Sequence, residues 1–151
     1  MTEIRFYHLQ RTSLEAALPK LLERTLARGQ RAVVIAGSAE RVEALTARLW
    51  TYDPGSFLPH GSKRDGRPER QPIWLTDTDE NPNGATVLFL TDGAQLALVG
   101  RFELCVEMLD GQDEAAVAAG RQRWAAYKEA GHSLVYYQQD EAGRWQEKAR
   151  A

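Results

Sequence analysis

Two cations and two large aromatic residues alternate near the C-terminal end of the chain. Arg121, Trp124 and Lys128 follow the spacing i, i+3, i+7, which places them on one face of a helix. Tyr127 lies beside that face. Cationic side chains bind carboxylates or phosphates, and the rings supply apolar contact. The pattern therefore predicts a site for a ligand that is both acidic and apolar, such as a nucleotide or a peptide tail with carboxylates and an aromatic end.

The same helix has a purely structural explanation, in which the rings pack inward and the cations extend their stems along the surface. Four alanines flank the aromatic residues, at positions 118, 119, 125 and 126. We expect these small residues to make the contact between the helix and a sheet. Trp124 and Tyr127 would then be free to line a groove, which favours a binding role.

A second aromatic cluster surrounds the predicted end of an earlier helix. It comprises Trp50, Tyr52, Phe57 and Leu58, with Pro59 and His60 directly after it. Large apolar residues on an irregular segment belong either to the core or to a surface for a protein partner, and the pattern favours neither. The long segment 51–71 also carries four cations between acidic residues, namely Lys63, Arg64, Arg67 and Arg70. We interpret them as a solvated loop, with a weak phosphate or acidic-peptide contact as the alternative.

Motifs for phosphate binding and catalysis are absent from the sequence. The apolar run RAVVIAG, residues 31–37, is not followed by the glycine spacing that cradles a pyrophosphate. The run His60–Lys63 lacks the earlier glycine of a phosphate loop and is predicted to be an exposed basic loop. The residues 79–84 begin like a calcium loop but position twelve is Leu90, so a polar turn is the better interpretation. The histidines have no metal-ligand or catalytic spacing. We predict no catalytic residue, no metal and no cofactor.

Composition indicates an ordinary globular domain. The chain has 151 residues, 43% hydrophobic and 26% charged, and a net charge of -2, which disfavours a general nucleic-acid-binding protein. One domain spanning 1–151 is expected. The lone Cys105 excludes an intramolecular disulfide and is expected to be a buried apolar residue. Neither a signal-peptide pattern nor a run of about 20 apolar residues is present, so we expect a cytoplasmic protein without a membrane contact.

Strand-like and helix-like segments alternate along the chain. Strands are predicted at 4–9, 31–37, 73–76, 85–91, 101–109 and 134–138, and helices after a capping box at Thr12 and Glu15, after Ser38 and after Asp113. Pro19 should kink the first helix or delay its start. The pattern predicts an α/β three-layer sandwich with a largely parallel sheet and helices on both faces.

Four segments in a fixed order carry a resemblance to a known family. They are FYHL near the start, RAVVIAG, the RLW-x6-FLPH segment of residues 48–60, and R-x-R-W-x-x-Y-K-x-A-G at residues 121–131. Together they resemble the chi subunit of bacterial DNA polymerase III holoenzyme, from Phe6 to about Tyr137. The resemblance implies a non-enzymatic adaptor that links the clamp-loader complex, through the psi subunit, to the acidic C-terminal tail of single-stranded-DNA-binding protein. It also implies a form similar to a nucleotide-binding domain without a phosphate loop.

The resemblance also implies two binding surfaces. The psi subunit, or a repair helicase as an alternative partner, would contact Trp50, Phe57, Pro59 and His60. The tail would contact Arg121, Trp124, Tyr127 and Lys128. Ala125 and Val117 stand at positions that are usually basic in the family, which predicts a less cationic tail site unless Lys128, Arg123 or the cations of 63–70 compensate.

Two other functions remain open from the residues. One is a direct single-stranded nucleic-acid-binding module that uses Trp124, Tyr127 and nearby arginines. The other is a degenerate nucleotide hydrolase, which the missing phosphate cradle disfavours.

Overall fold

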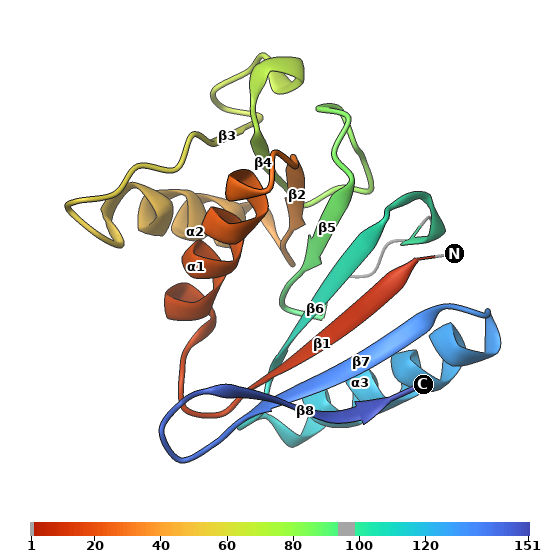
Figure 1. Ribbon diagram of the computed structural model, residues 1–151. Helices are drawn as coiled ribbons and strands as arrows, with labels where there is room; N and C mark the ends of the chain where they lie inside the picture. The colour runs from red at the N-terminus through yellow and green to blue at the C-terminus, as the bar shows by residue number, and fades with distance from the viewer. Residues whose placement is uncertain (1, 94–98) are drawn as a thin grey trace.

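One eight-stranded sheet organises the molecule, in the order β3-β4-β2-β5-β6-β1-β7-β8 (Figure 1). The computed structural model describes residues 2–93 and 99–151. The strands are β1 (Glu3–Leu9), β2 (Ala32–Ile35), β3 (Gly61–Ser62), β4 (Ile73–Thr76), β5 (Val87–Leu90), β6 (Leu104–Asp110), β7 (Ser133–Gln139) and β8 (Trp145–Arg150). The helices are α1 (Leu14–Ala27), α2 (Ala39–Thr51) and α3 (Glu114–Glu129), with short 3-10 turns η1 (Pro68–Arg70) and η2 (Val99–Arg101). Each neighbouring pair is parallel except β7 and β8. The predicted α/β class with a largely parallel sheet is therefore confirmed.

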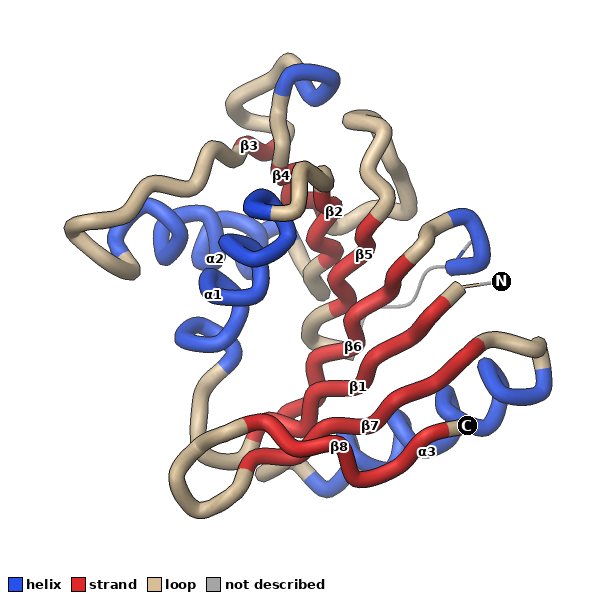
Figure 2. The backbone as a smooth tube through the Cα atoms, viewed as in Figure 1, coloured by secondary structure: helices blue, strands red, loops and turns tan. Residues whose placement is uncertain are grey.

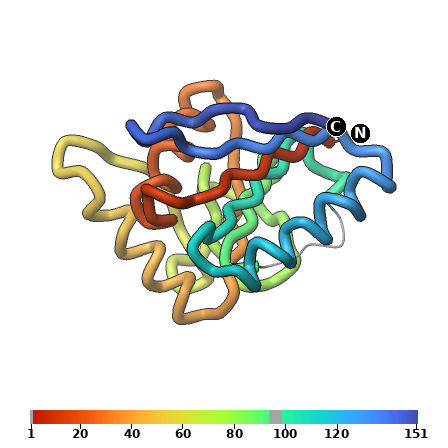
Figure 3. The backbone as a smooth tube through the Cα atoms, turned by 90° about the horizontal axis from the view of Figure 1, so that it is seen from below, coloured from red at the N-terminus to blue at the C-terminus, as the bar shows by residue number. Residues whose placement is uncertain are grey.

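Helices cover both faces of the sheet, as the apolar runs of the strands require. Helices α1 and α2 pack on one face, where Leu18, Leu22 and Leu45 belong to the same apolar cluster as Tyr7 of β1. Helix α3 packs on the other face, in the cluster that contains Phe6. Figure 3 shows α2 and α3 on opposite sides of the strands. Alternate side chains of β1 therefore pack into two separate cores, one on each face of the sheet.

Helix α1 begins one residue later than its sequence signals indicate. The capping residue is Ser13, whose side chain accepts a hydrogen bond from the backbone N–H of Ala16 at 3.2 Å. The predicted cap, Thr12, instead accepts a hydrogen bond from the side chain of Gln139 at 2.6 Å. A contact with β7, distant in sequence, therefore overrides the local signal.

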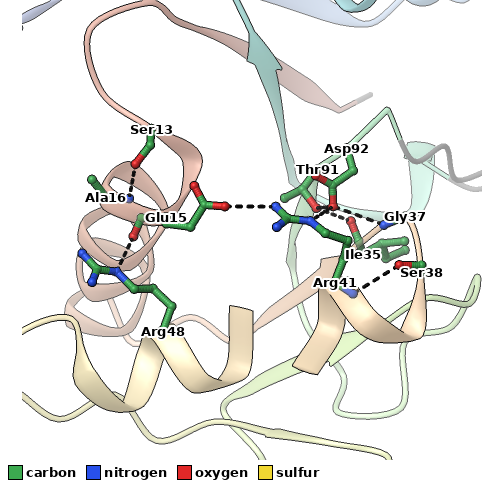
Figure 4. Close-up of polar contacts among 10 residues, drawn as sticks. All are labelled: Ser13, Glu15, Ala16, Ile35, Gly37, Ser38, Arg41, Arg48, Thr91 and Asp92. Atoms are coloured by element: carbon green, nitrogen blue, oxygen red, sulfur yellow. Dashed lines mark hydrogen bonds and ion pairs between the residues drawn. The ribbon is translucent and has the colours of Figure 1, made fainter. Parts of the chain in front are cut away.

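Pro19 lies inside α1 and does not delay its start. Proline has no N–H, so the carbonyl of Glu15, four residues earlier, loses its helical partner. The side chain of Arg48 on α2 donates to that carbonyl through Nε at 3.2 Å (Figure 4). The neighbouring helix thus satisfies the carbonyl that the proline leaves free, and the bond ties α1 to α2.

Helix α3 does not approach the sheet through its alanines, so that expectation was wrong. Those at positions 118, 125 and 126 are exposed, whereas Gly120 and Arg123 are buried. A Cβ at Gly120 would lie 2.8 Å from the side chain of Leu109, so a larger residue would require Leu109 to shift. Trp124 and Tyr127 pack against the apolar cluster that contains Leu109.

The segment 51–71 contains a strand that the sequence did not predict. Gly61 and Ser62 form β3 and pair with β4, and both are buried together with His60. A Cβ at Gly61 would lie 2.5 Å from the side chain of Gln71, so the edge is closely packed. The prediction of an exposed basic loop therefore holds for Lys63 alone within this run.

The turn between β4 and β5 is held by the carboxylate of Glu80. It accepts hydrogen bonds from the indole N–H of Trp74 at 3.0 Å and from the hydroxyl of Thr76 at 2.7 Å. Burial acts to raise the pKa of Glu80, but these hydrogen bonds outweigh it and hold the pKa below its ordinary value. The ionised carboxylate thus fastens this connection to the sheet.

Candidate partner-binding sites

Two large aromatic side chains, one at the end of α2 and one in the loop after it, are exposed to solvent. Trp50 is 56% exposed and Phe57 is 67% exposed, and their ring centroids lie 5.7 Å apart. The ring of His60 lies 4.6 Å from that of Trp50. The sequence left core and surface open for this cluster, and the structure places Trp50 and Phe57 on the surface. We name the set Trp50, Phe57, Pro59 and His60 the aromatic patch.

The aromatic patch is anchored by residues on either side of its exposed rings. Leu58 is buried in the core. The ring of His60 is also buried, with Nδ1 at 2.6 Å from the carbonyl of Leu58 and Nε2 at 3.2 Å from the carbonyl of Thr46. The hydroxyl of Tyr52 hydrogen-bonds the carboxylate of Glu23 on α1. These contacts hold the loop in the position drawn between α2 and β3 in Figure 2.

The predicted tail-binding residues of α3 divide between the surface and the core. Arg121 and Lys128 are exposed. Trp124 is half-buried, with its ring edge-on to Phe6 at 5.4 Å and to Tyr136 at 5.9 Å. Trp124 therefore packs on the sheet with one part of its ring and leaves another part accessible, three residues along the helix from the exposed Arg121.

Tyr127 is hydrogen-bonded within a buried polar cluster that the sequence did not predict. Its hydroxyl donates to Glu107 of β6 at 2.9 Å, and Glu107 also accepts from Arg123 Nε at 2.8 Å and Nη2 at 3.1 Å. Glu107 is 1% exposed. Burial raises the pKa of Glu107 although Arg123 opposes this, and burial together with the charge of Glu107 raises the pKa of Tyr127. Arg123 is thus paired inside the protein and does not compensate for Ala125 or Val117.

Two further residues beside Arg121 were missed by the sequence interpretation. The hydroxyl of Tyr136 and the Nδ1 of His8 lie 2.6 Å apart. The ring of Tyr136 stands edge-on to both Trp124 and His8. Burial lowers the pKa of His8, the Gly111 backbone opposes this, and the charge of Arg121 lowers it further. The alternation of β7 could have identified Tyr136, because every second residue of that strand faces α3.

The carboxyl ends of β2 and β5 meet where related folds bind phosphates. Here the carboxylate of Asp92 accepts from the backbone N–H of Gly37 at 3.3 Å and from Arg41 Nε at 3.1 Å (Figure 4). Arg41 Nη2 also donates to Glu15 at 3.2 Å. Asp92 has φ of 55°, a left-handed conformation that aspartate tolerates. A phosphate at the start of α2 would have to displace this carboxylate, which argues against a nucleotide hydrolase.

The fold is an α/β sandwich with a largely parallel sheet, and two large aromatic side chains, Trp50 and Phe57, are exposed on it. A sequence comparison identifies the family. The family of the DNA polymerase III chi subunit, HolC, matches residues 1–135, and the chain belongs to that family. A probable DNA polymerase III subunit chi from Rickettsia prowazekii (strain Madrid E) is 33% identical over 99 residues, which is 66% of this chain and 60% of the relative. Among the described residues, no helix is long and apolar enough to cross a membrane.

Proposed function

We propose that the chain is a non-enzymatic accessory subunit of DNA polymerase III that joins two protein partners during DNA replication. The aromatic patch binds the psi subunit of the clamp-loader complex, or a repair helicase in its place. The surface around Arg121 binds the acidic C-terminal tail of single-stranded-DNA-binding protein. Family membership supports the polymerase association, and the two surfaces support the linking role.

The observation that carries the proposal is the exposed pair Trp50 and Phe57. Burying a large aromatic side chain stabilises a complex by about 1.5–3 kcal/mol at ~25 cal/mol per Å² of apolar area. Both rings are more than half exposed and lie in contact, so a partner could cover them together. Adjacent aromatic anchors supported by a rigid base are typical of binding hot spots. The buried Leu58 and His60 supply that base.

The tail contact is proposed for the exposed side of α3. The guanidinium of Arg121 pairs with carboxylates of the tail, and Trp124 gives an apolar wall for a terminal aromatic residue. The hydroxyl of Tyr127 is bound to Glu107, so only its ring, which packs on Phe6 as Trp124 does, is left to contribute. Lys128 adds a second cation two turns from Arg121 along the helix. A short disordered tail loses entropy on binding, so a dissociation constant of about 1 μM or weaker is expected.

Titration calorimetry tests the tail contact directly. The full chain is titrated with a peptide of the tail of single-stranded-DNA-binding protein and with the same peptide lacking its terminal Phe. Arg121→Ala should weaken binding by about 1–3 kcal/mol. Arg28→Ala, which removes an exposed cation from the opposite side of the molecule, is the matched control. Equal affinity of the Arg121 variant and the wild type would reject the site.

The second surface is tested by co-purification with psi. Trp50→Ala and Phe57→Ala should each abolish a stable complex while leaving the tail titration unchanged. Retention of both partners by the double variant would reject the aromatic patch as the docking site.

A further inference from the structure

A basic groove lies between α1 and the hairpin formed by β7 and β8. Its cavity measures about 450 Å³. Lys20 and Arg24 of α1 line one side, and Arg144 and Trp145 of the hairpin line the other. We name this the hairpin groove. In Figure 1 the turn of the hairpin lies below the connection from β1 to α1.

The hairpin groove has charges of one sign. The residues that line it include three cations and no aspartate or glutamate. Within 2–93 and 99–151, none of Lys20, Arg24 and Arg144 forms an ion pair with a carboxylate. By contrast, the crevice near Arg41 contains four carboxylates, and Arg41 is already paired with two of them. The hairpin groove is therefore the cavity better suited to an anion.

The two walls of the groove are fixed relative to each other by Gln139. Its carbonyl oxygen accepts from the backbone N–H groups of Arg11 at 3.0 Å and Thr12 at 3.1 Å. Its amide donates to Thr12 Oγ1 at 2.6 Å and to the carbonyl of Gly143 at 3.2 Å. These four bonds tie the start of α1 to the hairpin turn. A ligand would thus meet a groove that is already formed, which lowers the entropic cost of binding.

Trp145 is held with part of its indole on the surface. The ring is half-buried and stands edge-on to Tyr7 at 4.9 Å, and Tyr7 stacks on Tyr137 at 5.1 Å. A rigid aromatic ring between cations is the arrangement on which bases of a single strand stack. Gln139, Arg144 and Trp145 lie beyond the residues 1–135 that the chi family matches. The groove therefore depends on a part of this chain outside the matched segment.

We propose that the hairpin groove binds single-stranded nucleic acid, with phosphates on Lys20, Arg24 and Arg144 and a base on Trp145. Lys20 and Arg24 are one helical turn apart, about 6 Å along the axis, and can engage neighbouring phosphates. An acidic peptide would need apolar pockets for anchoring side chains. The apolar part of the lining consists of Trp145, the alanines at 16 and 17, and Leu21, which is already buried in the core; the exposed large apolar residues, Trp50 and Phe57, lie elsewhere. Membership of a family of DNA polymerase subunits makes single strands an available ligand.

Fluorescence anisotropy with labelled oligodeoxythymidylate of about 16 nucleotides tests the proposal, because that length covers a typical single-strand site. Three phosphate contacts predict a slope of log K against log salt concentration of about -2, at ~0.7 for each contact. Lys20→Ala, Arg24→Ala and Arg144→Ala should each weaken binding and reduce the slope to about -1.4. Alanine suits the exposed helical positions of Lys20 and Arg24, and Arg144 is exposed in the turn before β8, so the variants should fold.

Two matched variants control for general loss of charge. Lys148→Ala removes a cation from the same hairpin outside the groove, and Arg28→Ala removes an exposed cation from the end of α1, also outside the groove. Both should bind the oligonucleotide with an unchanged slope. Quenching of tryptophan fluorescence by the oligonucleotide should be lost in Trp145→Phe.

Four outcomes would overturn the proposal. They are no binding in dilute buffer, equal weakening by the control variants, persistent quenching in Trp145→Phe, and displacement of the oligonucleotide by polyglutamate at equal charge concentration. The last would identify an acidic protein segment as the ligand. None of these outcomes bears on the tail or psi contacts, because they use other residues.

Discussion

The buried pair Glu107 and Arg123 should be the most sensitive polar feature of the domain. In Glu107→Gln the amide keeps a single acceptor oxygen where the carboxylate accepted three hydrogen bonds from Arg123 and Tyr127. The guanidinium then remains inside the protein without its counter-charge. Removing one member of a buried ion pair costs about 3–5 kcal/mol. Since the amide keeps one bond, we expect about 3 kcal/mol.

Urea unfolding at neutral pH, followed by circular dichroism, measures this cost. With a slope of about 2 kcal/mol per molar urea, the midpoint should fall by about 1.5 M. Glu103→Gln, which alters an exposed carboxylate just before β6, is the control and should shift the midpoint by less than about 0.3 M.

A triple variant separates the pair's contribution from the cost of leaving one charge alone. Glu107→Leu, Arg123→Met and Tyr127→Phe together remove the charges and the hydroxyl, so most of the stability should return. A loss below about 1 kcal/mol in Glu107→Gln would refute the reasoning. So would a triple variant less stable than the single one, because the charges would then be net stabilising.

Three other perturbations have defined outcomes. Ala125→Lys adds a cation one turn from Arg121, which is proposed to bind the tail, and should tighten tail binding by about 0.5–1 kcal/mol in dilute salt, measured by calorimetry. Arg48→Ala should lower the free energy of unfolding by about 1 kcal/mol because it frees the carbonyl of Glu15, and Pro19→Ala should reduce that loss by restoring the helical N–H. Because the pKa of Glu80 is lower in the folded protein, its stabilisation is present above the ordinary pKa of 4.5 and lost as pH falls through the folded value. Glu80→Gln should therefore make stability less steep in pH below 4.5, measured by urea unfolding across pH.

Contrary results would each identify a wrong step. A tail affinity insensitive to Lys at position 125 would place the tail away from that part of α3. An Arg48→Ala loss that is the same with and without Pro19 would mean that the bond to Glu15 contributes nothing. An unchanged pH profile in the Glu80 variant would assign the acid sensitivity to other carboxylates.

Local signals predicted the main elements well. Continuous apolar runs identified the central strands, and Ser38 and Asp113 are the N-caps of α2 and α3 as expected. These features depend on residues within one turn or one strand, so a short window of sequence contains the necessary information.

Features that depend on distant partners were missed. The strand β8 has the polar sequence WQEKAR and exists because β7 offers it hydrogen bonds. The pair between Glu107 and Arg123 joins β6 to α3. For the binding residues, types and spacing identified Trp50, Phe57 and Arg121 as candidates. Exposure of the first two, and the burial of the hydroxyl of Tyr127, required the packed fold.

A phosphate at the start of α2 would have to compete with the carboxylate of Asp92 for the backbone N–H of Gly37. Because Asp92 belongs to the chain, it is present at the start of α2 at an effective concentration in the range of mM or higher. A dissolved nucleotide must outcompete a tethered anion and also meets its negative charge. The backbone N–H of Gly37 and the guanidinium of Arg41 are therefore already engaged by an anion that the chain itself supplies.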